Sequence, residues 1–246
     1  MKIIADWPRP EELIENEVAT LEAMGNNPSL GQVQPQLAGA AKKKYQYYEN
    51  MNRKEKFSFS SWIVFPGSPI VSKAIIECLI VMNPEVPNSY DMVTYSFALC
   101  RLNRERKDHL IKKFHIDFTT TPKTGRLPLH PVFHLQSPGK LSVMLKDLGL
   151  KDDHLEPKLS EPRLCFAPTT LALLVDFLLR EFGGDRASTL TKLTRESRWR
   201  GLIRDNENLV LKPFFQACSG FFHDRECKKD PERHQLFSQD FAYGQC

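Results

Sequence analysis

Residues 112–136 read KKFHIDFTTTPKTGRLPLHPVFHLQ, and they contain two segments in which apolar and polar side chains alternate. The apolar positions are Phe114, Ile116, Phe118, Phe133 and Leu135. His115 and Asp117 share one side of the first segment, and His134 and Gln136 share one side of the second. Alternation with a period of two is typical of a strand that buries one face. Two such strands with a turn-rich connection suggest an antiparallel sheet, and the sequence leaves open whether these two strands pair with each other.

A third segment of the same kind precedes this pair. In MVTYSFALCRL (92–102), larger and smaller side chains alternate, and a short charged loop follows. Consecutive strands with short connections usually lie side by side. The predicted fold class is therefore α+β, with an antiparallel sheet of at least three strands (about 92–102, 112–119 and 131–137) flanked by helices.

Helices are expected on both sides of these strands along the chain, because apolar residues recur there at helical spacing. The predicted helices span 10–25, 35–51, 70–82, 168–182 and 187–203, with a short helix within 137–150. Periodicity alone does not exclude a buried strand at the end of 70–82. The apolar helix 168–182 has Pro168 near its start and Gly183 after it, and we expect it to cover the apolar face of the sheet.

The chain is expected to divide into three parts. They are an N-terminal helical arm (1–56), an α+β core domain (57–205) and an irregular C-terminal tail (206–246). A length of 246 residues with 41% hydrophobic and 26% charged side chains is that of an ordinary globular protein.

Composition also limits the functional classes. No apolar run is long enough to span a bilayer, and the N-terminus lacks the pattern of an export signal, so we expect a cytoplasmic protein without membrane contact. The six cysteines show no compact disulfide spacing and are read as buried or free thiols. The segment SPGK (137–140) lacks the spacing of a phosphate-binding loop, which argues against ATP or GTP hydrolysis.

The histidine and aspartate residues near the two strands form the main candidate site. Catalytic candidates are His115, Asp117 and His134, and His130 joins them as a candidate metal ligand. Imidazoles beside a carboxylate can hold a divalent metal ion that activates water. Alternatively, a histidine could act as a general acid or base, with Asp117 fixing its tautomer. The third interpretation is an ordinary solvated sheet face, on which such residues are common.

A second candidate metal site lies in the tail. Cys218, His223, Cys227 and His234 are ligand types that suit tetrahedral zinc, although their spacing is not that of a common zinc finger. Two unremarkable cysteines and two surface histidines would explain the same pattern.

A basic stretch near residue 200 is a candidate nucleic-acid surface. Its members are Arg195, Arg198, Trp199, Arg200 and Arg204. Arginines can contact phosphates while an aromatic ring stacks on a base. The formal net charge of +4 permits a DNA or RNA partner without favouring one, and scattered charges usually form a solvated face.

Three segments resemble a group of uncharacterised bacterial proteins. These segments are FHIDF (114–118), HPVFHLQ (130–136) and EPRLCFAPTTLALLVDFLLREF (161–182), within a likeness that covers about residues 110–185. The shared positions are His115, Asp117, His130, Pro131, His134 and Arg163. Some of these proteins look like components of defence-type gene clusters. The resemblance implies a shared fold more securely than a shared activity, since function belongs to sites.

Two functional classes are expected from these observations. The first is an accessory subunit of a bacterial multi-protein complex, with other protein subunits as partners and anti-phage defence on foreign nucleic acid as its setting. The second is a metal-dependent hydrolase or nuclease that uses His115, Asp117 and His134 with a divalent metal ion. The first is preferred, because no complete catalytic motif occurs in the chain.

Overall fold

The computed structural model describes nine stretches of the chain. They are 8–25, 56–65, 68–83, 90–102, 108–119, 133–136, 164–165, 167–183 and 192–216. The predicted helices 35–51 and 137–150 lie outside these residues, as do His130, Arg163 and all four tail ligands of the zinc prediction.

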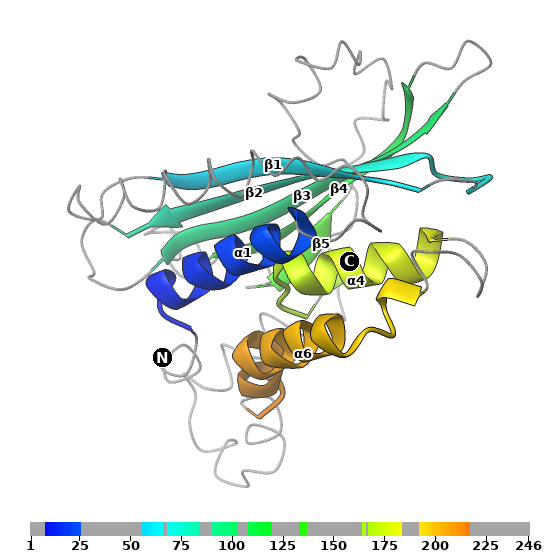
Figure 1. Cartoon of the computed structure of the whole chain (residues 1–246). Coiled ribbons are helices and arrows are strands. Elements are labelled where there is room, and N and C mark those ends of the chain that lie inside the picture. The colour runs from blue at the N-terminus through cyan, green and yellow to red at the C-terminus, as the bar shows by residue number, and fades with distance from the viewer. Residues whose placement is uncertain are drawn as a thin grey trace, which may run out of the picture.

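Six strands form one sheet in this part of the protein (Figure 1). They are β1 (Lys56–Val64), β2 (Lys73–Met82), β3 (Tyr90–Leu102), β4 (Asp108–Thr119), β5 (Phe133–Gln136) and β6 (Leu164–Cys165). All neighbours are antiparallel and follow the order of the sequence, so the sheet is a meander. The predicted α+β class is confirmed, and the three predicted strands correspond to β3, β4 and β5.

The prediction of a helix over 70–82 is wrong, because β2 occupies most of this segment. The strand lies between β1 and β3 and carries apolar side chains on both faces. An apolar run of this kind shows no clear alternation, and its apolar residues then match a helical spacing by chance. The β-branched residues Ile75, Ile76, Ile80 and Val81 are the feature that favours the strand.

β1 is a strand that the sequence interpretation missed. It begins at Lys56, and its Phe57, Phe59 and Ile63 are buried on the helix side of the sheet. Ser58 and Ser60 alternate with these apolar residues on the other face, which is the pattern of a half-buried strand.

The described helices are α1 (Pro10–Gly25), α4 (Leu171–Phe182) and α6 (Ser197–Asn206), which continues as the π-helix η2 (Glu207–Leu211). Figure 1 shows α1 and α4 packed on one face of the sheet, with α6 beyond α4. The predicted apolar faces of α1 and α4 are buried in the main core. This core contains Leu13, Ile14, Leu21, Phe57, Ile76, Tyr95, Ile116, Leu174 and Leu178, among others.

The helix ends differ from the predicted ones in two places. α4 begins at Leu171 because Thr170 is its N-cap, whose hydroxyl accepts a hydrogen bond from the Leu173 N–H at 3.4 Å. In the segment predicted as a helix over 187–203, residues 192 and 193 are helical, a turn at 194–196 follows, and α6 begins at Ser197; residues 187–191 lie outside the described part of the chain. Helical structure then continues through Gln216. The predicted irregular tail from 206 therefore differs from the structure over 206–216. None of the described helices is long and apolar enough to cross a membrane.

Candidate functional site

The pairing of β4 with β5 brings the two polar pairs of the sequence together. Asp117 lies opposite His134, and His115 lies opposite Gln136. Directly opposed residues of an antiparallel pair have Cβ atoms about 4.5–5.5 Å apart. The sequence left open whether these two strands pair, and the structure pairs them. The pairing places the backbone of His134 and Gln136 beside His115 and Asp117, whose side chains lie on the sheet face opposite α1 and α4.

His115 and Asp117 form the best-defined part of this site. His115 Nε2 lies 3.2 Å from Asp117 Oδ2, and the two side chains are only 12% and 20% exposed. This geometry suits an N–H donated to the carboxylate, which would orient the imidazole. The same distance would also suit two ligands of one metal ion. Ligand atoms that each lie about 2.1 Å from one ion are roughly 3.0–3.4 Å from each other.

The register extends the site into a row that crosses five strands. The row runs Ser60, Glu77, Ser96, His115, Gln136, one residue from each of β1 to β5. Ser96 is buried, and Glu77 is half-buried. Sequence reasoning missed Glu77 and Ser96 as members of the site, because Glu77 reaches this face only if 73–82 forms a strand.

The predicted metal set is only partly placed. His130 lies outside the described residues, and of His134 only the backbone position is described. Within the described part of the chain, no three side chains of His, Cys, Asp or Glu are grouped as metal ligands. His115 and Asp117 thus provide two candidate ligands, and the register places the backbone of His134 where a third could come from.

The same sheet face becomes apolar toward the hairpin that joins β3 to β4. Ile75, Ala98, Cys100 and Leu110 form a second buried cluster there, with Trp62 packed against it. Lys73 and Asp108 form an ion pair beside Cys100. Burial, followed by the nearby Asp108 carboxylate, raises the pKa of the Cys100 thiol to about 11.

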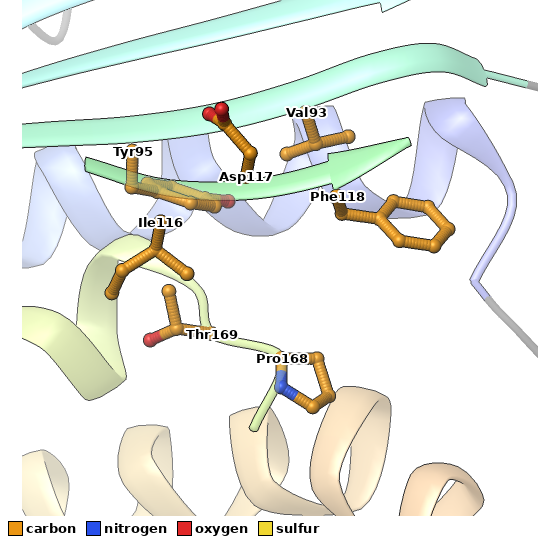
Figure 2. A pocket seen from close by; sticks show the side chains of 7 residues that line it. All are labelled: Val93, Tyr95, Ile116, Asp117, Phe118, Pro168 and Thr169. Carbon is orange, nitrogen blue, oxygen red and sulfur yellow. The ribbon is translucent and has the colours of Figure 1, made fainter. Parts of the chain in front are cut away.

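On the helix side, a small crevice lies between β3, β4 and the segment before α4 (Figure 2). Its lining residues are Val93, Tyr95, Ile116, Asp117, Phe118, Pro168 and Thr169. Its volume of about 10 Å³ is close to the minimum for one water molecule. In Figure 2 the Asp117 carboxylate points to the opposite side of the strand from Ile116, so the crevice and the His115–Asp117 pair are separate features.

The arginines of the predicted nucleic-acid surface are exposed, but its tryptophan is not. Arg195, Arg198, Arg200 and Arg204 all lie at the surface of the segment that contains α6. Trp199 is 4% exposed, and its Nε1–H donates a hydrogen bond to Asp176 of α4 at 2.8 Å. Its ring is thus part of the core and is not presented for stacking on a base.

Three exposed aliphatic side chains belong to one end of the sheet, which we call the hairpin end (68–73, 100–102 and 108–111). Ile70 is 62% exposed, Leu102 is 49% exposed and Ile111 is 39% exposed. A bulge in β4 opposite Leu99 and Cys100 interrupts the pairing of β3 with β4 here. Bulges bend a strand pair, and in Figure 1 this hairpin curves away from the helices.

The fold and these surfaces define an α+β protein with an antiparallel meander, helices packed on one face and a His–Asp pair on the other. No protein-family model, curated protein or solved structure matches the chain.

Proposed function

We propose that this chain is an interaction subunit that binds a protein partner through the hairpin end of its sheet. The observation that carries the proposal is the exposure of Ile70, Leu102 and Ile111 at this end. Single exposed apolar residues are common, whereas apolar residues grouped on a surface mark interaction sites. The resemblance of residues 110–185 to bacterial proteins of defence-type gene clusters supports a bacterial assembly acting on foreign nucleic acid as its setting.

Charge at the hairpin end favours one kind of partner surface. Arg101 is exposed beside Leu102, and Lys112 is half-buried beside Ile111. An apolar centre with a basic rim fits a partner surface that is apolar with an acidic rim, because opposed charges at a rim favour association and register.

The test is a binding measurement with the partner identified first. The tagged chain is purified from its native host, co-purifying proteins are identified by mass spectrometry, and the best candidate is purified for calorimetry. Leu102→Ser combined with Ile111→Ser should weaken binding at least about tenfold, because apolar anchors carry much of the affinity. Phe177→Ser on α4 is the matched control, since Phe177 is 48% exposed and is not one of the residues of the hairpin end. Equal losses in both variants, or no loss in the double variant, would show that the proposal is wrong.

A second candidate function is supported by the His115–Asp117 geometry. The distance of 3.2 Å between Nε2 and Oδ2 suits two ligands of one divalent ion, and the register places His134 opposite Asp117. Such an ion would activate water in a metal-dependent hydrolase or nuclease.

This second function is tested with metal alone before any substrate is tried. Binding of Mn²⁺ and Zn²⁺ is measured by calorimetry for the wild-type chain and for His115→Ala with His134→Ala. Loss of stoichiometric binding in the double variant supports a site at this face. His109→Ala is the control, because His109 is an exposed histidine on the same strand. Metal binding that survives the double variant would argue against this function.

A further inference from the structure

Glu17 of α1 is completely buried where α1, the sheet and α4 meet. Its Oε1 accepts a hydrogen bond of 2.5 Å from the Tyr95 hydroxyl of β3. Both of its oxygens accept from the backbone N–H of Leu171, the first residue of α4, at 3.2 and 3.1 Å. One carboxyl group thus joins three elements that are far apart in the sequence.

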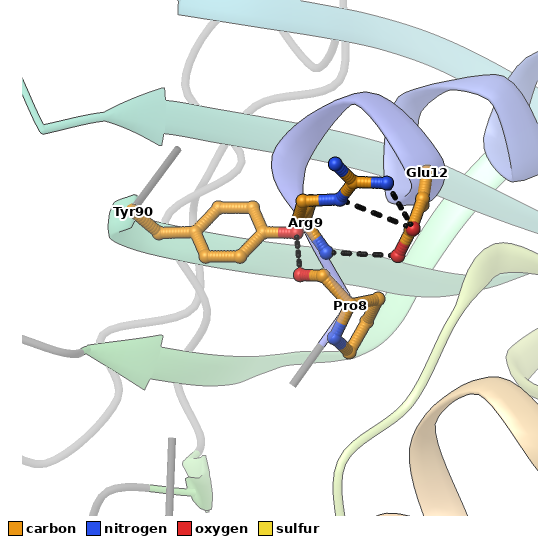
Figure 3. A network of polar contacts seen from close by, with 4 residues as sticks. All are labelled: Pro8, Arg9, Glu12 and Tyr90. Atoms are coloured by element: carbon orange, nitrogen blue, oxygen red, sulfur yellow. Dashed lines mark hydrogen bonds and ion pairs between the residues drawn. The ribbon is translucent and has the colours of Figure 1, made fainter. Parts of the chain in front are cut away.

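Other contacts hold α1 in the same position. Figure 3 shows the Tyr90 hydroxyl donating to the carbonyl oxygen of Pro8 at 2.8 Å, and Glu12 accepting from the Arg9 N–H at 3.1 Å. The second contact is half of a capping box, which fixes the helix start. Asn16 donates to Asn206 of α6 at 2.7 Å. The bonds of Tyr90 and Asn16 join neutral groups, and the contact with Arg9 lowers the pKa of Glu12, whereas burial raises the pKa of Glu17.

We propose that Glu17 makes the docking of α1 onto the sheet and α4 sensitive to pH, so that α1 takes up a proton as it docks and is released more readily as the pH rises. The geometric basis is that a carboxyl group leaves water completely on docking and meets neutral partners. An ionised carboxylate is costly to bury without a cation, so the neutral form is favoured there.

The groups that face Glu17 come from three elements. Tyr95 and, next to it, Tyr90 lie on β3, Cys78 lies on β2, and the N-terminus of α4 presents the Leu171 N–H. No cationic side chain of the described residues is among the groups that act on Glu17. Burial raises the pKa of Glu17 from 4.5 to about 7, while the hydrogen bonds from Tyr95 and Leu171 oppose that rise.

The sign of the effect follows from the two pKa values. With α1 undocked, Glu17 is exposed to water and ionises near its ordinary pKa of 4.5, and with α1 docked it ionises near 7. Docking therefore binds a proton between these values, and its equilibrium constant falls by up to about tenfold per pH unit there. The stabilisation of docked α1 by proton uptake at Glu17 is fully present below pH 4.5. It is lost as the pH rises through 7 and changes little at higher pH.

Hydrogen exchange measured by mass spectrometry tests this coupling on the full chain. Protection of residues 10–25, corrected for intrinsic exchange rates and compared with that of β2 and β3, is followed from pH 5.5 to 8. In the wild type the relative protection of α1 should fall by up to about 15-fold between pH 5.5 and 7. In Glu17→Gln, which cannot ionise, it should change less than about threefold over the same range. The same pH dependence in Glu17→Gln and in the wild type would overturn the proposal.

Two further variants keep the test decisive. Glu12→Gln is the matched control on the same helix, because the Glu12 carboxylate is largely exposed and its bonds to Arg9 lower its pKa. It should retain the wild-type pH dependence. If Glu17→Gln does not fold, Tyr95→Phe replaces it, because removing this hydrogen bond from the carboxylate should move the transition to higher pH. An unchanged transition in Tyr95→Phe would also overturn the proposal.

Discussion

The indole Nε1–H of Trp199 donates a hydrogen bond of 2.8 Å to Oδ1 of Asp176, which joins α6 to α4. Both side chains are buried, and Arg180 also contacts the carboxylate of Asp176. Trp199→Phe should retain much of the apolar contact but leave the carboxylate without its indole donor. We expect the free energy of unfolding to fall by about 1–3 kcal/mol, measured by urea denaturation.

Arg180→Met provides the comparison for this prediction. The Arg180 side chain is 56% exposed, so its ion pair with Asp176 is largely screened by solvent. Its loss should lower the free energy of unfolding by less than about 1 kcal/mol. A larger loss from Arg180→Met than from Trp199→Phe would contradict the view that the indole joins the two helices.

Replacing Ser61 with alanine is expected to stabilise the protein, because it removes a buried hydroxyl group. Its side chain is completely buried on the helix side of β1, and among the described residues none forms a hydrogen bond with its Oγ. A buried hydroxyl without a partner costs roughly 1–3 kcal/mol, so Ser61→Ala should raise the free energy of unfolding by about 1 kcal/mol. The control is Ser60→Ala on the other face, where Ser60 is half-buried and the change should stay within about 0.5 kcal/mol. A destabilised Ser61→Ala would refute this account.

The strands β4 and β5 could be predicted from the sequence because polar and apolar residues alternate along each of them. Their alternation, with a turn-rich connection between them, predicts both the strands and the face that His115 and Asp117 share. The contribution of β2 could not be predicted in this way, since its apolar residues face both sides. Glu77 lies in the row with Ser96 and His115 only because β2 pairs with β3. A single sequence does not show this pairing.

Glu17 illustrates a signal that was present in the sequence. It lies at helical spacing between Ile14 and Leu21, on the side of α1 that is otherwise apolar. A carboxylate on the apolar side of a helix indicates a buried acid with dedicated partners. Those partners could not be predicted, because Tyr95 and Leu171 are 78 and 154 residues away in the sequence.

The thiol of Cys100 should react slowly with alkylating reagents in the folded protein. It is completely buried, and its pKa of about 11 keeps almost all of it protonated at pH 8, whereas the thiolate is the reactive form. Mass spectrometry after brief iodoacetamide treatment at pH 8 should find the peptide with Cys100 at least about tenfold less modified than in urea-unfolded protein. Equal modification in the two states would show that this part of the sheet opens freely.

The hydrogen bond from Tyr90 to the carbonyl oxygen of Pro8 should stabilise the start of α1 independently of pH. The hydroxyl donates at 2.8 Å, the side chain is 2% exposed, and Pro8 is buried. Tyr90→Phe removes the donor and leaves a buried carbonyl, so α1 should become less stable by about 0.5–1.5 kcal/mol. A neutral hydroxyl and a carbonyl do not titrate between pH 5.5 and 8. Residues 10–25 of Tyr90→Phe should therefore lose the same amount of hydrogen-exchange protection at pH 5.5 and at pH 8. A loss that appears only at the higher pH would mean that Tyr90 acts through Glu17 instead of through Pro8.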